Sequence, residues 1–130
     1  MKKSIQRAAI WIPNLSRNSG GAELYLLHLA RILQEQCEVI LLCDRCEGCE
    51  ETVQRALRMH GMPDFEVRYV DDPSITDRTD FARQLLEKEQ TQHVNIERLL
   101  AELDIDLFIN GTYGTLCGFG CRSDDVVSIF

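Results

Sequence analysis

The sequence lacks the hydrophobic segments that mark membrane and exported proteins. Its apolar runs, such as Val39–Cys43, are far shorter than the ~20 residues that a membrane-spanning helix needs. The basic start Met1-Lys2-Lys3 is followed by Ser4–Trp11, where Gln6 and Arg7 interrupt any signal-peptide core. We therefore expect a cytoplasmic protein, either free in solution or peripheral to a membrane.

Positive charge is also scarce. The 130 residues include 14 basic and 21 acidic side chains, which gives a formal net charge of −7. Nucleic-acid binders and polybasic membrane modules need a positive surface, so we expect no nucleic-acid partner. Hydrophobic residues make up 45% and charged residues 27%, which is the ordinary composition of a globular domain.

Two nucleotide-binding signatures are absent. The chain contains neither G-x-G-x-x-G nor G-x-x-x-x-G-K-[ST], which argues against a dinucleotide-binding oxidoreductase and a P-loop NTPase. No Cys–His or Ser–His–Asp arrangement is evident along the sequence.

The apolar pattern that is present alternates between strand and helix. Short apolar runs predict strands, and apolar residues at helical spacing predict helices between them. The expected strands are Ala8–Ile12, Cys37–Cys43, Phe65–Val70, Ile105–Ile109 and Val126–Phe130, and the expected helices are Gly21–Gln36, Glu50–His60 and Thr79–Leu103, the last as one helix or two. This order predicts an α/β, Rossmann-like three-layer sandwich. The sheet should be mostly parallel, in the order 3-2-1-4-5, with helices on both faces.

The length favours a single domain over residues 1–130. Phe65–Val70 alternates between apolar and charged residues, so we place that strand near a sheet edge. The chain stops within the apolar segment Val126–Phe130, with no helix after it. We expect an incomplete domain whose sheet edge is open, and such an edge could pair two copies into a homodimer.

The predicted topology also indicates where a ligand would bind. Open α/β sheets bind ligands at the carboxyl ends of the strands, where the strand order reverses. In the order 3-2-1-4-5 this point lies between the first and fourth strands. The loops Pro13–Gly21 and Asn110–Gly114 leave the sheet there, and both carry Gly, Asn and Ser or Thr.

The first loop contains the main candidate site. Ser19, Gly20, Gly21 and Glu23 stand at the start of the first helix. Glycines allow close approach of a ligand, and the free N–H groups of a helix start attract phosphate. A flexible loop with a glycine cap is the alternative interpretation. Glu23 is three residues beyond Gly20, where a capping role is favoured over catalysis.

The second loop supplies the other candidates. Asn110, Gly111, Thr112 and Tyr113 offer amide, hydroxyl and ring groups for a sugar or nucleotide, or they form a simple strand-exit turn. Arg17 and Arg122 are candidate partners for a phosphate or carboxylate, although most arginines are only solvated.

The six cysteines are not expected to form a disulfide framework, because the chain has no export signal. Cys43, Cys46 and Cys49 are spaced C-x2-C-x2-C, which is a weak indication of zinc or iron–sulfur binding. A fourth ligand is missing locally. The alternative is a buried Cys43 with two loop thiols.

Several of these segments resemble one enzyme family. The segments Ala9–Pro13, Ser19–Glu23 and Val39–Leu42, with the Leu-rich helix between them, resemble the start of GT-B glycosyltransferases. The similarity is greatest to family 4, the retaining group that uses nucleotide-sugar donors. Asp106–Gly114 resembles the exit of the fourth strand in some members.

The resemblance implies an N-terminal, acceptor-side half of a two-domain enzyme that transfers a sugar from a nucleotide-sugar to an acceptor hydroxyl. Gly20 and Gly21 would approach the donor phosphates, and Asn110 and Thr112 would line the acceptor side. The partners would be a C-terminal GT-B domain, the nucleotide-sugar, and a glycan or lipid acceptor, with no metal cofactor. The chain alone is expected to be inactive, and the alternative is a stand-alone, non-enzymatic α/β binding module.

Overall fold

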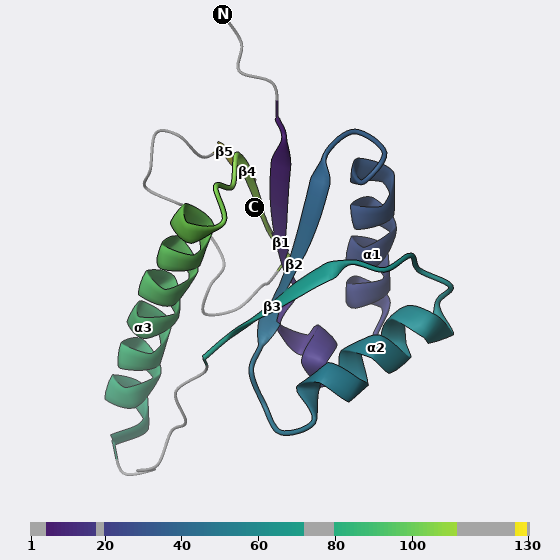
Figure 1. Ribbon diagram of the computed structural model, residues 1–130. Helices are drawn as coiled ribbons and strands as arrows, with labels where there is room; N and C mark the ends of the chain where they lie inside the picture. The colour runs from purple at the N-terminus through teal and green to yellow at the C-terminus, as the bar shows by residue number, and fades with distance from the viewer. Residues whose placement is uncertain (1–4, 18–19, 72–79, 112–126, 130) are drawn as a thin grey trace, which may run out of the picture.

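A computed structural model describes residues 5–17, 20–71, 80–111 and 127–129 of the chain. Strands and helices alternate along these ranges (Figure 1). The elements are β1 (Arg7–Trp11), the 3-10 turn η1 (Pro13–Ser16), α1 (Gly21–Leu33), β2 (Glu38–Asp44), α2 (Cys49–Met59), β3 (Glu66–Val70), α3 (Phe81–Glu102), β4 (Leu107–Asn110) and β5 (Val127–Ile129).

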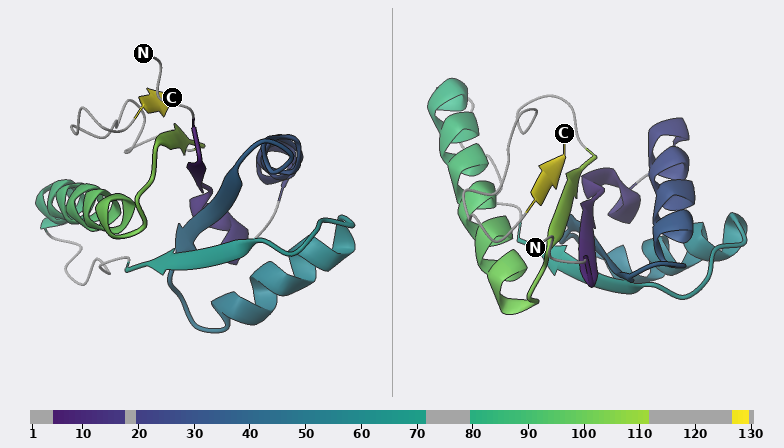
Figure 2. Two further views of the ribbon diagram at one scale, coloured as in Figure 1. Left: turned by 45° about the horizontal axis from the view of Figure 1, so that its top comes forward. Right: turned by 90° about the horizontal axis from the view of Figure 1, so that it is seen from above.

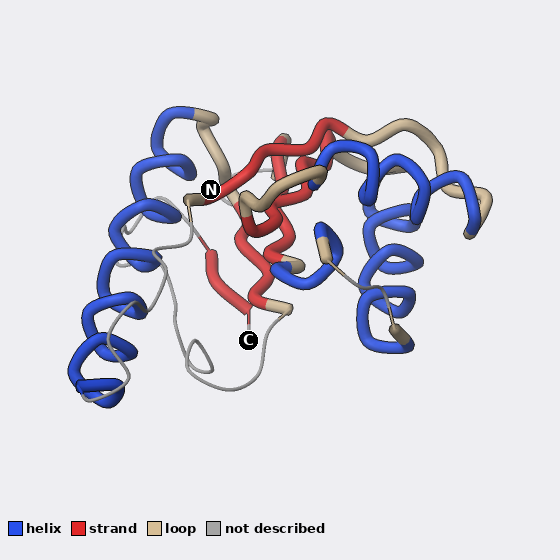
Figure 3. Tube along the Cα trace, turned by 90° about the horizontal axis from the view of Figure 1, so that it is seen from below, coloured by secondary structure: helices blue, strands red, loops and turns tan. Residues whose placement is uncertain are grey.

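The strands form one five-stranded sheet in the order β3-β2-β1-β4-β5. Every neighbouring pair is parallel. Helices α1 and α2 lie on one face and α3 lies on the other, so that the sheet is the middle of three layers (Figures 2 and 3). The α/β Rossmann-like fold and the strand order predicted from the sequence are both confirmed.

The burial of the strands follows their place in the sheet. From Val39 to Asp44, β2 is buried at every position, as expected for a strand covered by helices on both faces. By contrast, β3 alternates between half-buried and exposed residues until the buried Val70. It stands at the end of the strand order, so the predicted edge position is confirmed.

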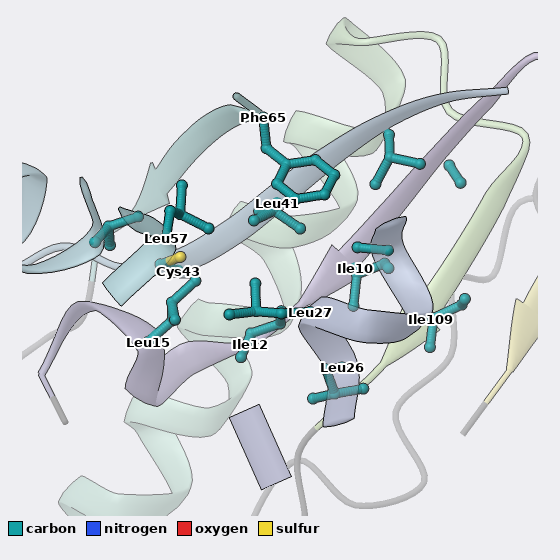
Figure 4. Packing of buried hydrophobic residues seen from close by; sticks show 14 of the residues in the cluster. Ile10, Ile12, Leu15, Leu26, Leu27, Leu41, Cys43, Leu57, Phe65 and Ile109 are labelled. Carbon is teal, nitrogen blue, oxygen red and sulfur yellow. The ribbon is translucent and has the colours of Figure 1, made fainter. Parts of the chain in front are cut away.

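Side chains from alternate strand positions build two separate cores. The larger core packs the sheet against α1 and α2 and includes Ile10, Leu27, Leu41 and Phe65 (Figure 4). The smaller core lies on the α3 face. It contains Ala9, Trp11, Ile40, Leu42, Val70, Ile96, Leu100, Ile105 and Phe108. Neighbouring residues of β2 therefore stabilise different layers.

One local feature differs from the sequence prediction, and a second decides between two alternatives that the sequence left open. Residues Pro13–Ser16, expected to be loop, form the turn η1, because Pro13 is well suited to the first position of a helical turn. Ser16 Oγ donates a hydrogen bond to the Pro13 carbonyl oxygen at 3.1 Å, and Leu15 is fully buried below it. The segment predicted as one helix or two is the single helix α3.

Candidate functional site

The carboxyl ends of β1 and β4 lie side by side, and the strand order reverses between them. Trp11 pairs in register with Asn110, and the Gly111 N–H donates to the Trp11 carbonyl oxygen at 2.9 Å. The first loop continues from this edge through η1 to the start of α1. The structure thus confirms that the topological switch point lies between the first and fourth strands.

Helix α1 begins at this edge with two glycines. Gly20 is the N-cap in an extended conformation, and Gly21 is the first helical residue. The Gly20 N–H donates to Glu23 Oε2 at 2.9 Å, so Glu23 has the capping role that its spacing predicted. The N–H groups in the first turn of a helix have no partner within the helix, so a side chain, water or ligand must satisfy them.

The three glycines of the site have different physical reasons to be glycine. A Cβ on Gly111 would lie 2.4 Å from Leu26 Cδ1 and 2.6 Å from the Trp11 carbonyl oxygen, so internal packing excludes a side chain there. Among the described residues, a Cβ on Gly21 would meet nothing within 4 Å, and one on Gly20 would meet only the flexible Glu23 carboxylate at 3.4 Å. The backbone of Gly20 does not require glycine either, because its φ is −117°. Neither conformation nor packing against the part of the chain that the structure describes explains the pair Gly20–Gly21.

A buried carboxylate lies at the end of β2. Asp44 is 7% exposed and accepts a hydrogen bond from Gln92 Nε2 of α3 at 3.4 Å. Its other oxygen, Oδ2, lies 3.8 Å from Nε of Arg17, whose side chain is 45% exposed. Asp44 therefore connects α3 to the residue that follows η1, and Arg17 presents a guanidinium at the carboxyl edge of the sheet.

Two further polar groups are buried on the α3 face of this edge. Asn110 is 6% exposed at the end of β4, directly beside Trp11 in the register. Trp11 is fully buried, and among the described residues its indole Nε1 has no hydrogen-bond partner. The site is thus more polar on the α3 side than the core beneath it.

Several predicted site residues lie outside the described ranges. These are Ser19, Thr112, Tyr113 and Arg122. Within the described ranges the fold gathers Arg17, Gly20, Gly21, Asn110 and Gly111 at the carboxyl edge.

The cysteines of the C-x2-C-x2-C segment follow β2 into α2. Cys43, Cys46 and Cys49 are free thiols, and Cys43 and Cys49 are buried. Burial is the main cause that raises the pKa of the Cys43 thiol far above its ordinary value. Within residues 5–17, 20–71, 80–111 and 127–129, no three His, Cys, Asp or Glu side chains are arranged to hold a metal ion.

Sequence reasoning missed Asp44 and Gln92. A signal for Asp44 was present, because it is a charged residue that directly follows an apolar strand at a carboxyl end. Gln92 carries no such signal. It lies among the polar residues of a long helix, and only tertiary packing shows that it is 5% exposed.

Comparison with known proteins shows that the fold is similar to parts of solved structures. No family model matches the chain, and no curated protein matches it significantly. Among solved structures, MurG of Acinetobacter baumannii aligns with a TM-score of 0.55 at 16% identity, over 85% of this chain and 30% of MurG. A protein described as the glycotransferase of kitacinnamycin aligns with a TM-score of 0.49 at 15% identity, over 84% of this chain and 25% of its own.

The chain therefore has the Rossmann-like fold of a part of MurG and spans less than a third of that protein. The similarity is one of fold alone. Within the described ranges, no helix combines the length and apolar character that crossing a membrane requires.

Proposed function

We propose that this chain is the acceptor-side, N-terminal domain of a glycosyltransferase. The complete enzyme transfers a sugar from a nucleotide-sugar to a hydroxyl of a glycan or lipid acceptor, with retention as in family 4. The single observation that carries the proposal is the pair Gly20–Gly21. Both glycines stand at a helix start at the switch point, and neither φ nor packing within the described ranges accounts for them. A ligand that approaches the backbone closely does account for them.

In this proposal the start of α1 faces the donor diphosphate. During transfer the bond between the anomeric carbon and the phosphate oxygen breaks, and the nucleoside diphosphate leaves with the electron pair. The acceptor oxygen bonds to the anomeric carbon, and its proton passes to the leaving diphosphate. The partial positive charge of the helix start and its free N–H groups favour the negative charge that builds up on the leaving diphosphate.

Arg17 and the end of β4 extend the proposed site on either side. The Arg17 guanidinium lies at the same edge and carries the charge that a phosphate binds. Asn110, Gly111, Thr112 and Tyr113 would line the acceptor side. A second, C-terminal domain would complete the cleft, and we propose that the chain does not catalyse transfer without it. The proposed setting is cytoplasmic.

Backbone NMR of the chain during titration with nucleoside diphosphates and nucleotide-sugars tests the donor site. We expect the largest amide shifts at Gly20, Gly21 and Ala22, with millimolar affinity because half of the cleft is absent. A titration that leaves these amides unmoved while others respond would contradict the assignment of Gly20 and Gly21.

A graded series at position 21 sharpens the same test. Because a Cβ at Gly21 meets no other described residue within 4 Å, Gly21→Ala, Gly21→Val and Gly21→Phe should fold normally, which circular dichroism checks. Diphosphate binding should fall as the side chain grows. The matched control is Gln36→Phe, an exposed position beyond the other end of α1, which should bind as the unmodified chain does.

A second candidate function is a non-enzymatic module that pairs through its sheet edge. The observation in its favour is that, among the strands that the structure describes, β5 ends the order and pairs with β4 alone. Light scattering over a concentration series decides between the two. A stable dimer that binds no nucleoside diphosphate would favour this alternative, whereas a monomer that binds one favours the glycosyltransferase domain.

A further inference from the structure

The turn between β2 and α2 has a cysteine at each end. The Cys49 N–H donates to the Cys46 carbonyl oxygen at 3.2 Å, which closes a four-residue turn over Glu47 and Gly48. Gly48 has φ 70° and ψ 16°, the conformation of the third residue of a type II turn. The ends of such a turn have Cα atoms within about 7 Å, and a disulfide spans Cα separations of about 4.4–6.8 Å.

The two thiols differ in exposure, and this difference determines which of them reacts first. Cys46 is half-buried, whereas Cys49 is 2% exposed at the first position of α2. An external oxidant therefore reaches the Cys46 sulfur first. The Cys49 thiol donates to Glu50 Oε2 at 3.5 Å, and the turn keeps its backbone next to that of Cys46.

The third cysteine of the segment is held away from this chemistry. Cys43 is fully buried in the larger core, together with Leu15 and Leu57 (Figure 4). Its thiol remains protonated because burial raises its pKa, and a protonated, enclosed thiol reacts slowly. The structure thus singles out two of the three neighbouring cysteines.

We propose that Cys46 and Cys49 form a redox-active dithiol, a modification site that takes a small disulfide such as oxidised glutathione. In the first step the Cys46 sulfur attacks glutathione disulfide, which forms a mixed disulfide and releases one reduced glutathione. In the second step the Cys49 sulfur attacks the Cys46 sulfur, which releases the second glutathione and leaves the Cys46–Cys49 disulfide. Two thiols are oxidised and one disulfide is reduced.

Oxidation has a defined structural consequence. In the reduced chain Cys46 Sγ donates a weak hydrogen bond to the Ser16 carbonyl oxygen at 3.4 Å. The disulfide removes this S–H donor, and with it one contact between the β2–α2 turn and η1. Arg17 follows Ser16 directly, so the oxidation state of the turn acts on the edge of the candidate site. The dithiol itself does not depend on the proposed transferase function.

Peptide mass spectrometry of the intact chain tests the proposal, because trypsin isolates the pair. Cleavage after Arg45 and Arg55 gives peptide 46–55, which holds Cys46 and Cys49 and no other cysteine. Cys37 and Cys43 fall together in peptide 32–45. After equilibration in a glutathione buffer, we expect peptide 46–55 to be lighter by two hydrogen atoms, to resist alkylation, and to recover two alkylation sites after reduction.

Three results would overturn the proposal. The first is glutathione retained on peptide 46–55, and the second is a cross-link between peptides 32–45 and 46–55. The third is a pair that stays fully reduced in the folded chain, in a buffer that oxidises the same pair in the urea-unfolded chain. In the folded chain the turn should raise the ratio of oxidised to reduced pair roughly tenfold over the unfolded chain, through a higher effective concentration.

Matched variants complete the test. Cys46→Ser and Cys49→Ser should each abolish the internal disulfide, whereas Cys37→Ser should leave it unchanged. Cys37 is a suitable control because it is a partly buried thiol at the opposite end of β2, where its Sγ donates to the Leu33 carbonyl oxygen. The result for the unmodified chain stands even if a serine variant folds poorly.

Discussion

The two faces of the sheet differ most at the carboxyl ends of the strands. On the α1–α2 face the final positions are apolar, with Cys43 in β2 and Ile109 in β4. One residue further along each strand, on the α3 face, stand Asp44 and Asn110, both buried and both polar. A core made only of apolar groups stabilises the fold, whereas buried polar groups cost free energy unless they are paired. The contrast indicates that the apolar α1–α2 face stabilises the fold. On the α3 face, the buried polar groups at the candidate site lower the stability of the fold.

The largest effect that tests this contrast comes from adjacent leucines on β2. Leu41 and Leu42 are both fully buried, Leu41 in the larger core and Leu42 in the smaller one. Each change to alanine should lower the free energy of unfolding by about 3 kcal/mol, since it removes buried methyl groups and leaves a cavity. Leu41→Ala should cost more, because its core holds more apolar side chains. Urea unfolding followed by Trp11 fluorescence measures both, and a larger loss for Leu42→Ala would reverse the assignment of the faces.

The glycines of the site give the next largest effect. Gly111→Ala should destabilise the chain by about 2 kcal/mol, because the new methyl group overlaps Leu26 and the Trp11 carbonyl oxygen. Gly21→Ala is the matched control and should change stability by less than about 0.5 kcal/mol. Thermal unfolding of the two variants compares them directly. Equal stability of the two variants would remove the distinction between a packing glycine and a ligand glycine.

Much of the fold could be predicted because its signals are local. The apolar run Val39–Leu42 needs burial on both faces, and the alternation in Phe65–Val70 needs one wetter face; both strands lie where those patterns require. The right-handed crossover rule then leaves few strand orders. The turn η1 was missed because a single 3-10 turn has no periodic pattern to detect.

The site could be predicted only where its residues are close together in the sequence. Gly20, Gly21 and Glu23 are neighbours in the sequence, and the capping hydrogen bond between Gly20 and Glu23 was found from their spacing. Asp44 and Gln92 are 48 positions apart and meet only because α3 crosses the end of β2. No spacing rule connects them. The packing reason for Gly111 likewise depends on Leu26, a residue of a distant helix.

Substitutions at Asp44 measure how much the polar groups at the end of the α3 face contribute to the free energy of unfolding. Asp44→Ala should lower the free energy of unfolding by about 1–2 kcal/mol, because the buried Gln92 amide loses its acceptor. Asp44→Asn keeps an acceptor oxygen and loses the attraction to the half-exposed Arg17, which is worth about 0–1 kcal/mol. Chemical denaturation of the pair separates the hydrogen bond from the charge. If Asp44→Asn is as costly as Asp44→Ala, charge and not hydrogen bonding governs this position.

The cap at the start of α1 has a smaller effect. Glu23→Ala removes the acceptor for the Gly20 N–H and should cost about 0.5–1 kcal/mol. Glu23→Gln keeps an acceptor oxygen and should retain most of that stability. Thermal unfolding compares the two with the unmodified chain. A loss of diphosphate binding in Glu23→Gln with unchanged stability would show that Glu23 serves the ligand as well as the cap.

The smallest effect at neutral pH concerns Tyr69, which lies on the α1–α2 side of the edge strand β3. Burial, with the nearby Cys43 as the next cause, raises the pKa of Tyr69 from 10.0 to about 12, and Arg45 opposes the shift. The folded chain therefore holds the phenolic proton more tightly than the unfolded chain. This contribution to stability is fully present below pH 10 and is lost as the pH rises from 10 to about 12.

Over this range the unmodified chain should lose more stability than Tyr69→Phe. The control Tyr25→Phe, at a position that is 70% exposed, should behave as the unmodified chain does. Tyrosinate absorbance and urea unfolding across the range measure both effects, and parallel losses in all three proteins would show that β3 is too open at its edge to protect the phenol.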